Sequence, residues 1–200
     1  LKCLIKAIQL APQEADLYVN RCMILFYMER YEDALKDAER ALTLNAGDPD
    51  AYYNRGMVLQ KLGYFEDAIA DYSNAIACDE RYIKAYYQRA TLFLEIREHE
   101  EAMLDLNTVT ELQPDDPDAF LVRAFVHLDT NHPDWAIPEL SRAIELRPTN
   151  PQYYYLRGVA YHMTGNAKDA LFDWNKTLEL QPHSIDTWLN RAQLFLEFER

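Results

Sequence analysis

The sequence predicts an all-α protein built as a solenoid of antiparallel helical hairpins. Alanines recur every 34 residues, without insertion or deletion, at Ala34, Ala68, Ala102, Ala136 and Ala170. Between them, apolar residues follow spacings of three and four, the period of a helix with one buried face. A fixed period of this length is typical of stacked hairpin repeats.

The first helix of each interval is marked by two residues four places apart, which fall on one helical face. The first is aromatic: Tyr18, Tyr52, Tyr86, Phe120, Tyr154 and Trp188. The second is small: Cys22, Gly56, Ala90, Ala124, Gly158 and Ala192. We expect the alanines of the 34-residue series to lie where the paired helices approach most closely.

Turn residues separate the helices. The apolar spacing breaks near Gly63, Asn131 and Gly165, residues that tolerate left-handed backbone geometry. Prolines close several intervals, at Pro12, Pro114, Pro148 and Pro182. Pro138 falls inside a predicted second helix and removes one of its hydrogen bonds. The pattern predicts twelve helices and no strand within 15–184.

The aromatic, small, alanine and proline positions together resemble the tetratricopeptide repeat, and the interval 49–82 matches best. The resemblance implies a right-handed superhelix and covers the whole chain as one array. Its full repeats are 15–48, 49–82, 83–116, 117–150 and 151–184, with half-repeats at 1–14 and 185–200. Both ends leave apolar side chains such as Leu4, Ile8, Phe195 and Phe198 without the neighbour that a repeat supplies. We therefore expect an excerpt of a longer protein.

Composition narrows the class of partner. The 200 residues carry a formal net charge of −13, which opposes binding to nucleic acid and to anionic lipid. No apolar run approaches the length of a membrane span, so we expect no membrane insertion. Cys3, Cys22 and Cys78 lack metal-site spacing and predict reduced thiols in an intracellular, cytoplasmic protein.

Motifs for catalysis and metal binding are absent from the sequence. It contains no glycine-rich phosphate loop, no HExxH and no GxSxG. His127 stands at a core aromatic position, and we interpret it as a core histidine because no partner nucleophile accompanies it. We expect no catalytic residue, no metal, no cofactor and no enzyme activity in this chain.

A charged pair also recurs with the 34-residue period. One arginine and one acid per repeat should come level across the hairpin and form a ladder of bidentate ion pairs. The predicted pairs are Arg55 with Asp71, Arg89 with Asp105, Arg123 with Glu139, and Arg157 with Asp173. The alternative is a row of arginines offered to an anionic ligand. Because the acids share the period, we assign the ladder to folding.

The side of each first helix opposite its packing face should line a concave groove, the usual ligand surface of the family that the chain resembles. In the first half of the array the groove candidates are Tyr53, Asn54, Met57 and Tyr87. In the second half they are Leu121, Val122, Phe125, Tyr155, Leu156 and Val159. Apolar groups of this size predict a protein or peptide partner, unless the array or another segment covers them.

Three functions remain open at this stage. The leading prediction is a scaffold that binds a peptide or protein segment in the concave groove. The second is the substrate-presenting region of a larger enzyme such as a protein glycosyltransferase. The third, an Hsp70 or Hsp90 co-chaperone, is disfavoured. Of the carboxylate clamp that the family's chaperone-binding members use, only Asn54 and Lys84 are present, while Val19, Met23 and Gln88 replace the other donors.

Overall fold

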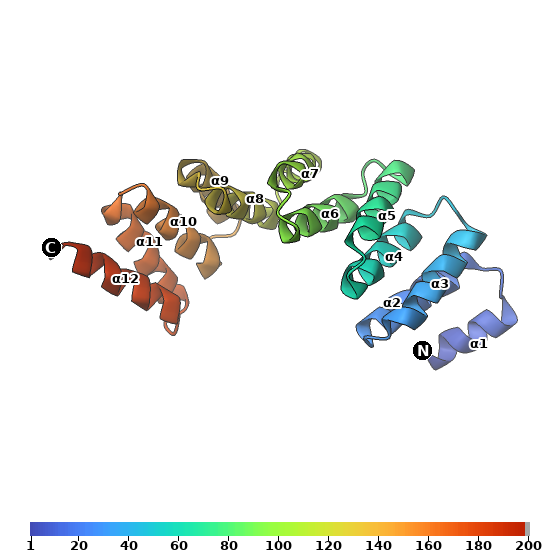
Figure 1. Ribbon diagram of the computed structural model, residues 1–200. Helices are drawn as coiled ribbons and strands as arrows, with labels where there is room; N and C mark the ends of the chain where they lie inside the picture. The colour runs from blue at the N-terminus through green and yellow to red at the C-terminus, as the bar shows by residue number, and fades with distance from the viewer. Residues whose placement is uncertain (199–200) are drawn as a thin grey trace. The chain divides into compact units, whose positions relative to one another are not determined.

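The computed structural model describes residues 1–198, and the side chain of Phe198 and residues 199–200 lie outside that description. Across the described residues the chain forms twelve α-helices and no strand (Figure 1). The predicted all-α fold and the predicted number of helices are confirmed. The trailing half-repeat is described only as far as residue 198.

Helix boundaries repeat with the sequence period. The first helices of the hairpins are α2 (Ala15–Tyr27), α4 (Pro49–Leu62), α6 (Ile83–Glu95), α8 (Pro117–Asp129), α10 (Pro151–Met163) and α12 (Ile185–Phe198). The second helices are α1 (Lys2–Leu10), α3 (Tyr31–Leu44), α5 (Phe65–Cys78), α7 (His99–Leu112), α9 (Pro133–Leu146) and α11 (Ala167–Leu180). Every first helix therefore begins at the first residue of its predicted repeat or half-repeat.

Three first helices begin with the same cap. Asp48, Asp116 and Asn150 each accept a hydrogen bond from the backbone N–H two residues later, at 2.9, 3.0 and 3.0 Å. A proline follows each cap as the first helical residue. The backbone N–H that proline lacks would have no partner within the first turn of a helix, so proline costs nothing at this position. The cap and the proline together therefore set where these helices start.

The turn inside every hairpin has one left-handed residue at the same register. Its φ is 57° at Glu29, 83° at Gly63, 70° at Arg97, 60° at Asn131 and 79° at Gly165. The next residue donates its N–H to the carbonyl five residues back, as Tyr64 does to Leu59 at 2.9 Å, which is the bond of a Schellman cap. Sequence analysis found the turns at Gly63, Asn131 and Gly165. It missed those at Glu29 and Arg97, because neither residue favours positive φ.

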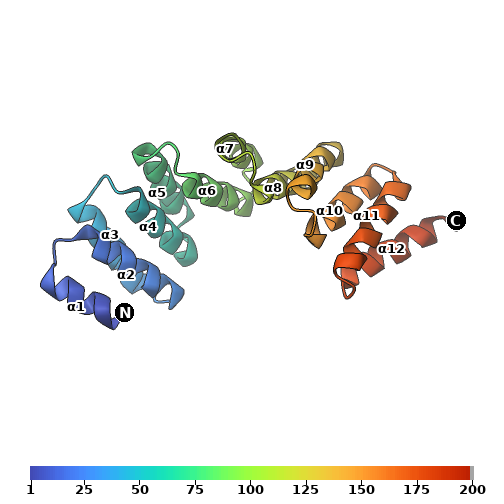
Figure 2. The same ribbon diagram turned by 180° about the vertical axis from the view of Figure 1, so that it is seen from behind.

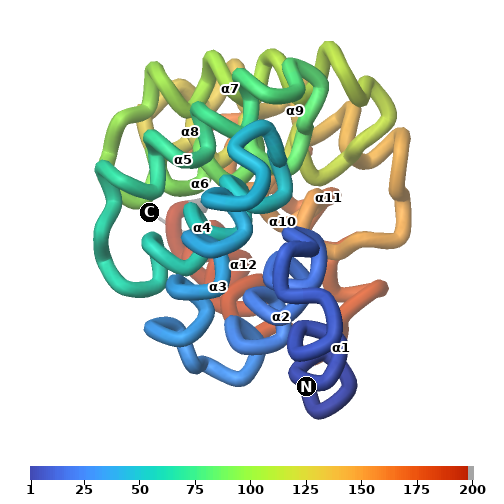
Figure 3. The backbone as a smooth tube through the Cα atoms, turned by 90° about the vertical axis from the view of Figure 1, so that its right-hand side faces the viewer, coloured from blue at the N-terminus to red at the C-terminus, as the bar shows by residue number. Residues whose placement is uncertain are grey.

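The chain divides into two compact units, Leu1–Leu112 and Gln113–Arg200. The first holds α1 to α7 and the second holds α8 to α12. Within each unit, consecutive helices lie side by side and short loops join them (Figures 2 and 3). The alanines of the 34-residue series have no exposed surface in either unit, as expected for the contact between paired helices. The prediction of one continuous array over 1–200 stays a prediction.

Residues sixteen apart in a hairpin have complementary sizes where the two helices meet. Gly56 faces Tyr72, and a Cβ at Gly56 would lie 2.8 Å from the tyrosine Cε1. Gly158 faces Trp174, and a Cβ there would lie 2.5 Å from the indole Nε1. In two other repeats the same offset pairs a buried alanine with a buried leucine, Ala90 with Leu106 and Ala124 with Leu140. In the first full repeat it pairs Cys22 with Ala38. A large residue on the second helix thus requires a small one on the first, because interiors are close-packed.

Pro138 lies within α9 without ending it, since the helix continues from Pro133 to Leu146. Its side chain is exposed. Within residues 1–198, no helix has both the length and the apolar character needed to cross a bilayer.

Candidate protein-interaction surface

The arginine–acid ladder occupies the interior of each hairpin. Arg55 donates from Nε and Nη2 to the two oxygens of Asp71, both at 2.7 Å. Equivalent two-point contacts of 2.6 to 2.9 Å join Arg21 to Asp37, Arg89 to Asp105, and Arg157 to Asp173. In the fourth full repeat, Arg123 Nη2 lies 2.7 Å from Glu139 Oε1. The pairs are those that the sequence period indicates, with Arg21 and Asp37 added.

Burial and hydrogen bonding shape the electrostatics of the ladder. The paired carboxylates retain between 1 and 13% of their side-chain exposure and the arginines between 17 and 27%. The hydrogen bond to its carboxylate raises the pKa of Arg55, and the same cause raises the pKa values of Arg21 and Arg157. Burial raises the pKa of Glu139, partly offset by the charge of Arg123.

Two further contacts hold ladder arginines in place. Arg89 Nη1 donates to Ser73 Oγ at 2.7 Å, and Arg157 Nη1 donates to Ser141 Oγ at 3.0 Å, both serines being on the preceding second helix. The guanidinium also lies over the aromatic ring three residues earlier, for example 5.8 Å from the Tyr52 centroid to Arg55 Cζ. The serines were missed by sequence analysis, although their shared position sixteen residues before an arginine was a usable signal. The donors of Arg89 and Arg157 are thus engaged both within their own hairpin and with the preceding one.

The outward face of the first helices in the first unit is only partly available. Tyr53 and Tyr87 are half-buried. Tyr53 contacts the Tyr82 ring edge-on with centroids 5.6 Å apart, and burial raises its pKa. The structure buries two candidates of the predicted groove, since Asn54 is 5% and Met57 is 9% exposed. Met57 packs into the core with Tyr72 and Leu92, which is the physical reason that it leaves the surface.

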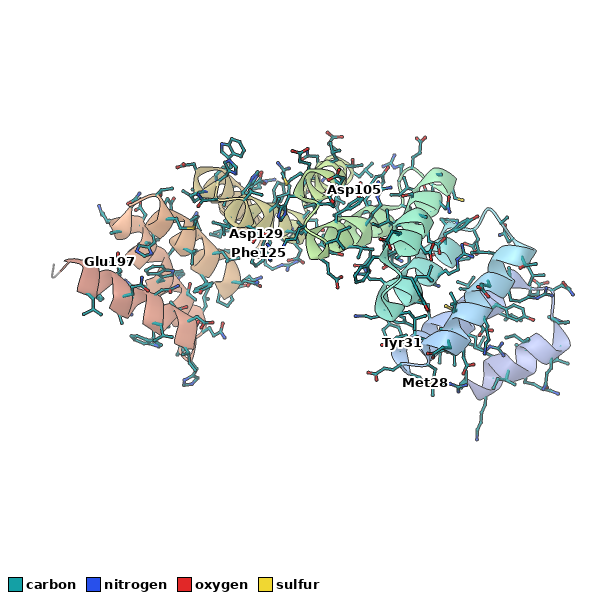
Figure 4. All side chains as sticks on the ribbon, in the orientation of Figure 1. Met28, Tyr31, Asp105, Phe125, Asp129 and Glu197 are labelled. Carbon is teal, nitrogen blue, oxygen red and sulfur yellow. The ribbon has the colours of Figure 1, made fainter. Side chains whose placement is uncertain are left out.

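In the second unit the corresponding face is apolar. Phe125 is 39% exposed, and it lies on α8 one turn before Asp129 (Figure 4). Met163 on α10 is 46% exposed. Of the groove candidates named from the sequence, four are half-buried: Leu121, Val122, Tyr155 and Val159. Leu156 is the exception at 8% exposure, because it packs with Ala124 and Leu140 in the hairpin core.

Leu121 and Tyr155 join the two hairpins of this face. Both pack against the same buried cluster, formed by Ala124, Ala136, Leu140, Leu156 and Ala160. Tyr155 also accepts a hydrogen bond at its hydroxyl from Asn190 Nδ2 of α12, at 3.3 Å. The apolar side chains of α8 and α10 thus share one support, and we call Leu121, Val122, Phe125, Tyr155, Val159 and Met163 the apolar face.

Acids at the edges of the first-helix faces are held by the protein itself. Asp50 accepts a hydrogen bond from the Tyr82 hydroxyl, and Asp118 accepts one from the Tyr153 hydroxyl at 2.8 Å. Arg147 Nη1 also donates to Asp118 at 3.1 Å. Burial, followed by the bond to Asp118, raises the pKa of Tyr153. These acids therefore have structural roles at the starts of α4 and α8.

His127 is half-buried beside Trp135, with ring centroids 5.6 Å apart and the rings edge to face. Burial lowers the pKa of His127, and the charges of Arg123 and His132 lower it further. Throughout residues 1–198, no group of three or more His, Cys, Asp or Glu side chains is arranged to hold a metal ion.

Repeated hairpins, an internal ladder and one apolar face define an α-solenoid repeat protein. Models described as tetratricopeptide repeat match residues 49–82 and 83–116, and a TPR repeat model matches 24–63 and 134–165. The chain belongs to the tetratricopeptide repeat family. No curated protein sequence matches it.

Solved structures show the same fold. YrrB, described as a TPR protein with an unusual peptide-binding site, shares 22% identity with a TM-score of 0.79, over 94% of this chain and 97% of its own. MamA from Desulfovibrio magneticus shares 21% sequence identity with a TM-score of 0.77, over 86% of this chain and 97% of its own. A tetratricopeptide repeat protein from Parabacteroides merdae shares 18% sequence identity with a TM-score of 0.81, over 92% of this chain and 73% of its own. At these identities the likeness establishes the fold alone.

Proposed function

We propose that the chain is a protein-interaction scaffold whose apolar face on α8 and α10 binds an apolar segment of a partner peptide or protein. The observation that carries the proposal is the exposure of Phe125 and Met163, at 39 and 46%, on the outward side of first helices. Burying such side chains under a partner removes apolar surface from water, and an aromatic ring supplies a large contact area. The peptide-binding site described for YrrB, a protein of the same fold, supports a peptide as the ligand class.

Selection from a displayed random-peptide library on the 200-residue protein tests the proposal. Peptides so obtained are expected to carry apolar or aromatic side chains and to bind in a saturable manner. Phe125→Asp should weaken them by roughly 30-fold, since an anchor at an interface contributes about 2 kcal/mol. Leu121→Asp should also weaken them.

Phe172→Asp is the matched control, because Phe172 is 67% exposed but lies on the second helix α11. It should leave binding unchanged. Far-UV circular dichroism of each variant separates loss of binding from loss of structure. Selected peptides that bind the Phe125 and Phe172 variants equally well would place the interaction elsewhere.

A further inference from the structure

One side of α10 stays exposed although helices of the preceding and the following repeat are in contact with it. Helices α9 and α11 lie beside α10 (Figures 1 and 2), and α8 shares a buried cluster with it. From α12, Asn190 Nδ2 donates to the Tyr155 hydroxyl at 3.3 Å. Met163 is nevertheless 46% exposed, and Val159 is half-buried. The neighbouring repeats therefore leave this part of the apolar face open.

Groups that can form hydrogen bonds are scarce on the apolar face. Among its side chains, Tyr155 alone has an O–H or N–H group, and its hydroxyl already accepts the bond from Asn190. Aliphatic residues, Val122 and Leu156, occupy the middle of α8 and α10. At the same register the first helices of the first unit have carboxamides: Asn20, Asn54 and Gln88. A carboxamide both donates and accepts hydrogen bonds, whereas an aliphatic side chain does neither.

This composition favours one conformation of the bound segment. The backbone N–H and C=O groups of an extended segment have no partner within the segment, so those that face aliphatic side chains stay unpaired. A helix pairs the same groups internally and presents one apolar stripe. The lengths also agree. Tyr155, Val159 and Met163 cover two turns of α10, about 12 Å, and apolar residues at i, i+4 and i+7 of a partner helix cover about 10 Å.

The charges of α8 and α10 indicate the charge of the partner. Outside the arginine–acid ladder, the acids of these helices are Asp118 and Asp129, and neither helix has a lysine or a further arginine. Arg147, which follows α9, donates to Asp118 at 3.1 Å. The whole chain has a net charge of −13. Complementary charge steers association and disfavours partners of like charge, so a cationic partner fits this surface better than an acidic one.

We propose that the segment bound on the apolar face is an amphipathic helix with lysine or arginine beside its apolar stripe. The inference rests on the proposed function, because it assigns a conformation and a charge to the ligand of the same site. The apolar stripe packs between Phe125 of α8 and Met163 of α10 and covers both. The competing occupants are an extended apolar segment and a second copy of this chain. A second copy has the same net charge of −13, which opposes self-association.

Two displayed peptide libraries separate a helical ligand from an extended one. Both contain peptides of about 16 residues, a length at which an isolated helix is marginal in water. In the first library, a cross-link between two cysteines four residues apart holds the helix. The second library has the same average composition, no cross-link, and a central proline that prevents a helix. Both are selected on the intact 200-residue chain, and the bound peptides are tested again on Phe125→Asp and on the control Phe172→Asp.

Peptides whose binding depends on Phe125 are expected from the cross-linked library. They should have apolar residues at i, i+3 or i+4, and i+7, and more lysine and arginine than acid. In fluorescence anisotropy, a proline placed in the middle of such a peptide should weaken binding at least about ten-fold. Changing its flanking lysines to glutamate should weaken binding at least about three-fold. Met163→Asp in the protein should also weaken binding, with circular dichroism showing that the variant keeps its helices.

Each contrary result overturns a defined part of the proposal. Phe125-dependent peptides that come only from the proline library, or that tolerate a central proline, overturn the helix and leave the proposed function intact. Selected peptides with more acid than lysine and arginine overturn the assigned charge. If neither library yields a Phe125-dependent peptide, the proposed function falls together with this inference. Self-association in sedimentation velocity that Phe125→Asp abolishes identifies a second copy as the occupant.

Discussion

Replacing Gly158 by alanine tests the size complementarity between paired helices. The new Cβ would lie 2.5 Å from Trp174 Nε1 and 2.6 Å from Cδ1, closer than non-bonded carbon atoms approach. Trp174 is fully buried, so neither the ring nor the helix can move without disturbing the core. Overpacking of this kind costs roughly 1–3 kcal/mol, while exchanging glycine for alanine inside a helix returns about 1 kcal/mol. Because the contacts are as short as 2.5 Å, the cost should fall in the upper part of that range, about 2–3 kcal/mol, which leaves a net loss of about 1–2 kcal/mol.

The double variant Gly158→Ala with Trp174→Leu is the sharper experiment, because it reproduces the Ala124/Leu140 pair of the preceding repeat. Trp174→Leu alone leaves a cavity beside glycine and should cost about 2–4 kcal/mol. In the double variant the added methyl group fills part of that cavity. The two changes should therefore couple favourably, by about 1–3 kcal/mol.

Urea denaturation followed by circular dichroism measures the free energies of unfolding, and hydrogen exchange of α10 and α11 locates the effect within the second unit. Gly47→Ala is the control, since its Cβ would lie 3.7 Å from the nearest atom, an ordinary contact. Strict additivity in the cycle, or a Gly158→Ala variant as stable as the parent, would refute the reasoning.

The remaining predictions concern the ladder, a turn and a titrating group. Arg89→Ala should lower the free energy of unfolding of the first unit by roughly 3 kcal/mol in urea denaturation, because it leaves the Asp105 carboxylate buried without its cation. A loss below about 1 kcal/mol would mean that water reaches the carboxylate in the variant. Arg97→Gly should raise stability by about 1 kcal/mol, since glycine adopts the positive φ of this turn without strain, and an unchanged or lower melting temperature would contradict this. Burial lowers the pKa of His127 in the folded protein, so on acidification the unfolded chain takes up this proton at a higher pH than the folded protein does. The free energy of unfolding should therefore fall as the pH drops from about 6.5 towards the lower pKa of the folded state. His127→Phe should flatten this dependence in melting temperatures measured between about pH 7 and 5, and an equally steep curve would assign it to other groups.

Much of this fold is local in origin, which is why the sequence predicted it. The 34-residue spacing shows where each hairpin recurs. The glycines at 63 and 165, and the prolines that follow the caps Asp48, Asp116 and Asn150, act over a few residues and fix where helices end and begin. The ladder pairs followed from the same period, because a hairpin with a constant turn brings residues sixteen apart level with each other. Glu29 and Arg97 show the limit, since their left-handed turns are imposed by the flanking helices against the residues' own preference.

What only the tertiary structure decided is which side chains remain exposed. Asn54, Met57 and Leu156 satisfy the same helical spacing as Tyr53 and Tyr155, yet they are buried. Met57 and Leu156 are buried because they pack against residues of a neighbouring hairpin, such as Leu92 and Leu140. Phe125 stays 39% exposed at an equally apolar position. The pairing of Gly158 with Trp174 likewise emerges from atoms on separate helices. Periodicity along one helix assigns a residue to a face, but exposure depends on what the next helix brings against that face.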